Sequence, residues 1–97
     1  MIRLYQTEWC PHSHRVRQRL TELGVPFVAV QVEADREDRD EMRAATGADV
    51  IPVLVLDDGH VLDGDADEIL AELNRRFDEA PDAVDHKAKG PKLQAAD

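Results

Sequence analysis

The chain has 97 residues, a length that suits one small domain. Its formal net charge of −9 disfavours nucleic acid and membranes as partners, because no basic field attracts phosphate groups. The single cysteine excludes an internal disulfide, and no apolar run is long enough to cross a bilayer. The first residues also lack a signal-type apolar stretch, so we expect a reducing, cytoplasmic location.

The first third of the chain predicts a strand, a helix and a second strand. Residues 2–6 read as a strand that overlaps a mostly apolar run from Met1 to Tyr5, and the apolar residues between positions 11 and 23 recur at helical spacing. Gly24 is a residue that commonly ends a helix. Residues 27–32 are nearly all apolar, which predicts a strand buried on both faces of a sheet. Because a helix joins them, the two strands should run parallel.

The rest of the chain predicts a helix, a hairpin and a last helix. Residues 35–46 carry charges spaced four apart, which indicates a solvated helix. Residues 50–56 read as a third strand, and Asp-Asp-Gly at 57–59 as a turn to a short return strand at 60–62. The last helix has apolar positions at helical spacing, namely Ala66, Ile69, Leu70, Leu73 and Phe77.

The resulting order of elements is βαβαββα, which is an α/β fold. It predicts a four-stranded mixed β-sheet with three helices on its faces. We expect residues 1–80 to form this domain. Residues 81–97 have little apolar content and no periodicity, so we expect them to form a disordered C-terminal tail.

Cys10 lies where the first predicted strand gives way to the first predicted helix, and Pro11 suits the first helical position. Unpaired backbone N–H groups and the positive end of the helix dipole should therefore point at its sulfur. That environment favours the thiolate, which is the nucleophilic form. Arg15 and the nearby histidines are candidates to lower the pKa further. A lone cysteine is often a small buried hydrophobe, but this placement favours a functional thiol.

Three segments resemble those of glutaredoxins and of the thioredoxin-like N-terminal domain of glutathione S-transferases. Cys10-Pro11-His12-Ser13 resembles the active-site motif, with serine in place of a second cysteine. Val50-Ile51-Pro52 resembles the segment before the family's cis-proline, and residues 63–67 resemble the turn that holds the glutamyl end of glutathione. The resemblance extends to about residue 80 and implies a thioredoxin-like fold.

The resemblance implies a monothiol thiol–disulfide oxidoreductase. The Cys10 thiolate would exchange with mixed disulfides of glutathione or an analogous low-molecular-weight thiol, and Ser13 would support it without being able to resolve the mixed disulfide. The implied partners are that small thiol and protein mixed disulfides. We expect the protein itself to be a monomer. The implied binding residues are Trp9, Pro11, His12, Ile51, Pro52, Gly64, Asp65 and Ala66.

The chain departs from the family pattern near each motif. No lysine stands at positions 7–9, Val50 replaces the usual threonine or serine, and Asp63 replaces the first of two glycines. Glu8 and Asp63 also add negative charge where an anionic thiol would dock. These departures leave two alternatives for the small thiol: glutathione, or a different low-molecular-weight thiol.

Two other functions stay open. Some monothiol relatives bridge an iron–sulfur cluster between subunits, and Cys10 would then be a ligand in a binding module without turnover; Pro11 stands where those relatives carry glycine. The second of these functions is that of a domain for recognition only, in which Cys10 is chemically inert. His12 and His14 alternate with Cys10, but their side chains diverge on a helix, so we expect no metal ion there.

Overall fold

The computed structural model describes residues 1–77 of the chain. The strands are Ile2–Gln6 (β1), Phe27–Gln31 (β2), Val53–Val55 (β3) and Val61–Leu62 (β4). The helices are Pro11–Glu22 (α1), Asp40–Thr46 (α2) and Ala66–Arg76 (α3), and a short 3₁₀ turn spans Arg36–Asp38. The predicted domain end near residue 80 and the predicted tail at 81–97 lie outside the described residues.

The four strands form one mixed sheet in the order β2-β1-β3-β4. β1 and β2 run parallel, with Ile2 opposite Phe27. β3 runs antiparallel to β1, with Leu4 opposite Leu54, and β4 runs antiparallel to β3. This arrangement confirms the predicted mixed sheet with three helices, including the parallel first pair and the final hairpin.

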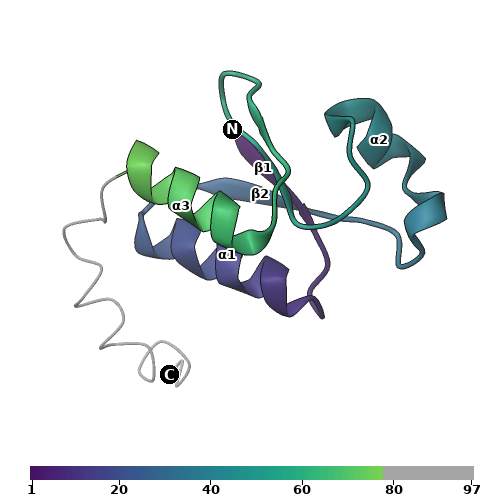
Figure 1. Cartoon of the computed structure of the whole chain (residues 1–97), viewed down its shortest axis with the longest axis horizontal. Coiled ribbons are helices and arrows are strands. Elements are labelled where there is room, and N and C mark those ends of the chain that lie inside the picture. Colours follow the sequence, from purple (N-terminus) through teal and green to yellow (C-terminus); the bar gives the residue numbers. More distant parts are fainter. Residues whose placement is uncertain (78–97) are drawn as a thin grey trace, which may run out of the picture.

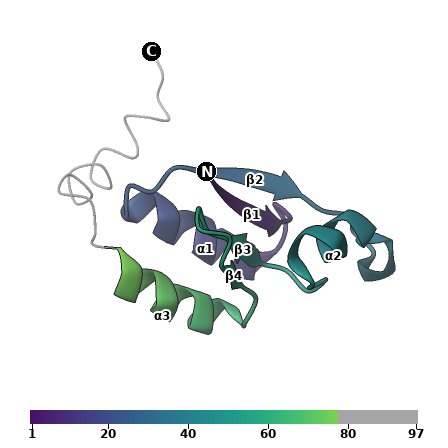
Figure 2. The ribbon, with the colours of Figure 1, turned by 90° about the horizontal axis from the view of Figure 1, so that it is seen from above.

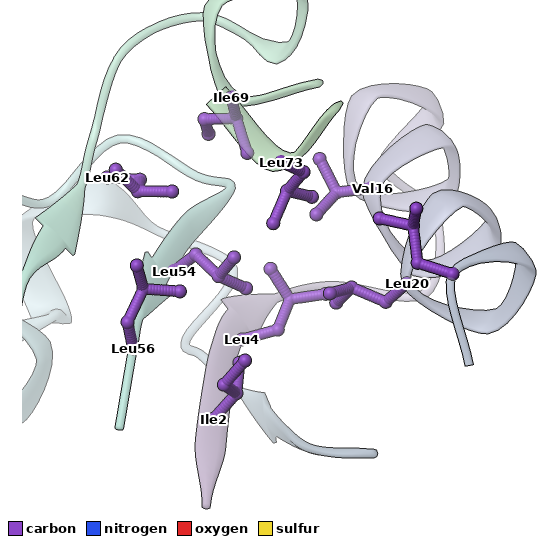
Figure 3. Packing of buried hydrophobic residues seen from close by; sticks show 10 residues of the cluster. Ile2, Leu4, Val16, Leu20, Leu54, Leu56, Leu62, Ile69 and Leu73 are labelled. Atoms are coloured by element: carbon purple, nitrogen blue, oxygen red, sulfur yellow. The ribbon is translucent and has the colours of Figure 1, made fainter. Parts of the chain in front are cut away.

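The main core lies between the sheet and the two long helices, α1 and α3. These helices lie side by side on one face of the sheet, while α2 stands apart from them (Figures 1 and 2). Alternate residues of β1 and β3 point toward α1 and α3, as the two-residue period of a strand requires (Figure 3). The fully buried members of this core include Leu4, Leu20, Leu54, Ile69 and Leu73.

A smaller cluster covers part of the opposite face of the sheet. Tyr5 of β1 and Val53 and Val55 of β3 meet Met42 of α2 there. α2 is short and contributes only this one buried residue. None of the helices within residues 1–77 has the length and apolar character that a bilayer crossing needs.

The prediction that the second strand is buried on both faces is wrong. β2 has a neighbouring strand on one side only, because the strand order places it at the edge of the sheet. Val28 is 45% exposed and Ala29 is exposed as well. Its β-branched residues predict a strand correctly, but they carry no information about strand order.

The helix predicted over residues 35–46 and the strand predicted over residues 50–56 are both shorter in the structure. The helix divides at Arg39, whose backbone has φ −90° and ψ 46°, outside the helical region. Its guanidinium donates to the carbonyl oxygens of Glu33 and Ala34 at 2.8 and 3.2 Å, instead of pairing with a charge four positions away along a helix.

We expect Leu73→Ala to lower the free energy of unfolding by about 2–5 kcal/mol, because a fully buried leucine would leave a cavity. Alanine is a strong helix former, so helix propensity does not oppose the change. Denaturant unfolding measures the effect. Leu70→Ala in the same helix is the matched control, since Leu70 is only partly buried and should cost less. Equal costs at both positions would contradict the packing described for α3.

Candidate active site

The topology brings three segments that are distant in the sequence to one end of the sheet, the side on which β1 and β4 end and β3 begins. Tyr5 lies opposite Val53, so the end of β1 adjoins the start of β3. β4 runs parallel to β1 because each is antiparallel to β3, and its last residue therefore lies at the same end of the sheet. The Cys10 loop, the segment at 50–52 and the start of α3 consequently converge there.

The sulfur of Cys10 caps the N-terminus of α1. The backbone of Cys10 is extended, with φ −78° and ψ 116°, and its Sγ accepts a hydrogen bond from the backbone N–H of Ser13 at 3.4 Å. An oxygen of serine or aspartate usually occupies that capping position. Pro11 is the first helical residue, and the first turn contains no acidic side chain. Cys10 is partly exposed, so the sulfur is held by the helix and still reachable from solvent.

The pKa of the Cys10 thiol is lower than its ordinary value. Partial burial of the sulfur opposes ionisation, but several groups outweigh it: the Ser13 hydroxyl, the backbone N–H groups of Ser13 and His12, and the positive charge of Arg17. The Ser13 Oγ atom is buried and makes no hydrogen bond of ordinary geometry within residues 1–77. Its hydroxyl is therefore available to a neighbouring thiolate.

Arg17 of α1 lies beneath the thiol loop in a polar network that sequence reasoning missed. Its Nη1 atom donates to the side-chain oxygen of Gln6 and to the carbonyl oxygen of Thr7, the latter at 3.4 Å. The same atom lies 3.8 Å from the carboxylate of Glu8, and Nη2 lies 3.5 Å from Nδ1 of His14. Gln6 is only 1% exposed. A glutamine at the end of a predicted strand is the signal in the sequence that could have pointed here, since a polar side chain that becomes buried needs hydrogen-bond partners.

Arg15 does not lower the pKa of Cys10, contrary to the expectation from its position. Its Nη2 atom is 2.6 Å from the carboxylate of Asp67, so Arg15 joins the N-terminal half of α1 to the first turn of α3. Arg17, two positions further along the helix, is the cation that acts on the sulfur.

The segment before β3 is held in place by three arginines, Arg36, Arg39 and Arg43, which we call the arginine clasp. Nε of Arg36 and Nε of Arg43 donate to the Asp49 carboxylate at 2.8 and 3.0 Å. Nη1 of Arg39 donates to the Asp49 carbonyl at 2.8 Å. The hydrogen bonds from Arg36 and Arg43 lower the pKa of the Asp49 carboxyl.

The peptide bond between Ile51 and Pro52 is cis, the geometry that the resemblance implied. Pro52 is buried, Ile51 is partly exposed and Val50 is exposed. Trp9 is 85% exposed beside Cys10. Apolar side chains from two segments thus remain accessible at the end of the sheet that carries the thiol.

The start of α3 is capped by its own side chains. Asp65 is the N-cap residue, and its Oδ1 accepts a hydrogen bond from the backbone N–H of Glu68 at 2.9 Å. This hydrogen bond is one half of a capping box. Ala66 is buried, whereas Gly64 is partly exposed. Within residues 1–77, no group of three or more histidine, cysteine, aspartate or glutamate side chains is placed to hold a metal ion.

A mixed four-stranded sheet, a cis-proline before its third strand and a cysteine that caps the first helix define a thioredoxin-like domain. A family model described as Glutaredoxin matches residues 2–61. The chain belongs to the glutaredoxin family.

Individual relatives agree with this assignment. The chain is 29% identical over 70 residues to Glutaredoxin 3 of Escherichia coli K12, covering 72% of this chain and 82% of that protein. It is 33% identical over 64 residues to an uncharacterized glutaredoxin-like 8.6 kDa protein in the rubredoxin operon of Clostridium pasteurianum, covering 66% and 84%.

A solved glutathione S-transferase from Methylobacillus flagellatus, with glutathione bound, has a similar fold. Its TM-score is 0.64 at 27% identity, over 84% of this chain and 38% of that one. The chain therefore spans well under half of the length of that transferase, and the similarity concerns the thioredoxin-like fold.

We expect Arg17→Gln to raise the pKa of Cys10, because it removes the nearby positive charge and keeps a polar side chain. The alkylation rate near neutral pH should fall several-fold, since it follows the thiolate fraction. The midpoint of alkylation against pH measures the change. Arg75→Gln is the matched control. Arg75 lies in the last turn of α3, so this substitution should leave that midpoint unchanged. An unchanged midpoint in Arg17→Gln would refute the electrostatic role.

The clasp makes a prediction about acid stability. A carboxyl whose pKa is lowered on folding stabilises the fold above its unfolded pKa of about 3.9, and this stability is lost as the pH falls through the folded pKa. We therefore expect Asp49→Asn to melt at a lower temperature than the wild type near pH 7, and the two melting temperatures to converge as the pH falls below the folded pKa of Asp49. Asp58→Asn, on the exposed hairpin, is the control. A difference in melting temperature between Asp49→Asn and the wild type that stays constant with pH would contradict the role of the charged carboxylate.

Proposed function

We propose that the protein is a monothiol thiol–disulfide oxidoreductase with Cys10 as its nucleophile. One observation carries the proposal: the partly exposed Cys10 sulfur caps α1 and receives the Ser13 N–H, with a lowered pKa. Thiolates at helix N-termini are the reactive thiols of such enzymes. Membership of the glutaredoxin family supports the same chemistry.

The reaction takes place in two exchanges. The Cys10 thiolate attacks the small-thiol sulfur of a protein mixed disulfide, so that a new S–S bond forms at Cys10 and the protein sulfur leaves as a thiolate, which takes up a proton. A second small-thiol molecule, as its thiolate, then attacks the sulfur of the small thiol held on Cys10. This step releases the small thiol's own disulfide and restores the Cys10 thiolate. The reduced small thiol supplies the electrons.

Ser13 makes the mechanism monothiol. A hydroxyl cannot form a disulfide with Cys10, so the second exchange needs an external thiol. The backbone N–H of Ser13 and its buried hydroxyl instead stabilise the thiolate, both as nucleophile and as leaving group. Ser13 is thus proposed as a catalytic residue that contributes no redox chemistry of its own.

The small thiol is proposed to lie across the three converging segments. Trp9, Pro11 and His12 are exposed beside the sulfur, and backbone groups of Ile51 would pair with the peptide-like part of the ligand, as an added strand does. The turn at 64–66 would receive its far end. The structure of the Methylobacillus flagellatus transferase with bound glutathione, which has a similar fold, supports a small thiol as the ligand. A monomer acting in a reducing, cytoplasmic compartment completes the proposal.

Intact-mass spectrometry tests the function. After incubation with oxidised small thiols, we expect the wild type to gain one small-thiol unit and Cys10→Ser to gain none. Ser13→Ala should still form the adduct, more slowly near neutral pH, because the sulfur loses the hydroxyl. Ser13→Cys should form the adduct and then expel it, leaving an internal disulfide. A wild-type protein that reacts no faster than free cysteine would refute the proposal.

A further inference from the structure

The turn that leads into α3 is densely acidic. Residues 63–68 contain four carboxylates and no cationic side chain: Asp63, Asp65, Asp67 and Glu68. Helix N-termini normally attract anions, because their backbone N–H groups lack partners. Whether this one can accept an anionic ligand therefore depends on where its own carboxylates lie.

The chain's own carboxylates already occupy this helix N-terminus. Oδ1 of Asp65 accepts the Glu68 N–H at 2.9 Å. The Glu68 carboxylate folds back over Gly64, so that a Cβ atom at position 64 would collide with its Oε2. Asp67 is engaged with Arg15 at 2.6 Å. A ligand carboxylate placed on this turn would therefore meet the negative charges of Asp65 and Glu68 at close range, while Asp67 holds the nearby Arg15 in an ion pair.

The cations around the site are engaged as well. Arg15 pairs with Asp67, and Arg17 contacts Gln6 and the Glu8 carboxylate. The three arginines of the clasp bind Asp49 and backbone carbonyls. Among the described residues near Cys10, each guanidinium therefore has a partner, and a ligand carboxylate would have to displace one.

The same turn is well supplied with hydrogen-bond acceptors. Asp63 is exposed, and the Asp67 side chain is 78% exposed even in its pair with Arg15. Carboxylate oxygens accept hydrogen bonds and attract positive charge. Hydroxyl, amide and ammonium groups of a ligand fit this surface, because each of them donates.

We infer that the small thiol used by this site carries hydroxyl, amide or ammonium donors, and no carboxylate, at the end that lies against α3. The inference rests on the proposed function and names its substrate class: an uncharged or cationic, donor-rich thiol. Each glutathione molecule carries more carboxylates than ammonium groups, so glutathione would be a poor substrate by this criterion.

The test compares oxidised glutathione with pantethine, an uncharged disulfide of similar length that carries hydroxyl and amide groups. Rates of adduct formation at Cys10 are measured for both, each divided by the rate of 2-mercaptoethanol with the same disulfide. We expect the normalised pantethine rate to exceed the glutathione rate by about tenfold or more, the factor for about 1.4 kcal/mol. Esterified oxidised glutathione should regain much of the difference. Added salt should narrow the gap by screening the carboxylates.

Two variants test the residues that carry the inference. Glu68→Gln and Asp63→Asn remove one charge each with little change of shape, and each should lower the ratio of pantethine rate to glutathione rate several-fold. Asp58→Asn, on the hairpin at the opposite end of the sheet, is the matched control and should leave both rates unchanged.

The possible failures are distinguishable. If neither disulfide reacts faster with Cys10 than with free cysteine, the proposed function is wrong and the inference falls with it. If both react rapidly and oxidised glutathione matches or exceeds pantethine, the proposed function stands and the inference is overturned. A ratio that does not change in Glu68→Gln and Asp63→Asn would also overturn it.

Discussion

The hydrogen bond from the Ser13 N–H to the Cys10 sulfur joins the chemistry of this protein to its fold. That N–H belongs to the first turn of α1, which is fixed by the packing of Val16 and Leu20 into the core. The sulfur replaces the oxygen that would otherwise cap the helix, so forming the helix and activating the thiol are one event. A substitution that loosens α1 would therefore weaken both.

The elements best predicted from the sequence are those whose residues decide their own structure. β1 lies in a mostly apolar run, α1 and α3 carry a clear apolar period, and the bounds of all three agree closely with the prediction. The edge position of β2 depends on strand order, which no local pattern contains. The division of the helix predicted over 35–46 depends on Arg39 and its contacts with backbone carbonyls outside α2.

The candidate site was predictable to a similar degree. Cys10 was identified because it stands at a helix start, where local rules apply, whereas Ser13 and Asp65 were identified through the resemblance of their segments to a known family. The network around Gln6 and Arg17 was not identified, since it links a strand end, a loop and a helix across a distance that only the folded chain closes. Long-range polar contacts leave little trace in sequence periodicity.

Gly64 gives the turn before α3 an unusual freedom. Its φ angle lies outside the left-handed region, and the nearest atoms that an alanine Cβ would meet there all belong to Glu68. The flexible carboxylate lies closest and would have to move, while the Glu68 Cβ at 3.1 Å requires a slight shift of the first turn of α3. An added methyl group would thus swing a negative charge away from the turn without altering the charge of the protein. The ligand preference of this surface can change through steric substitution alone, along a mutational route that leaves every ionisable residue in place.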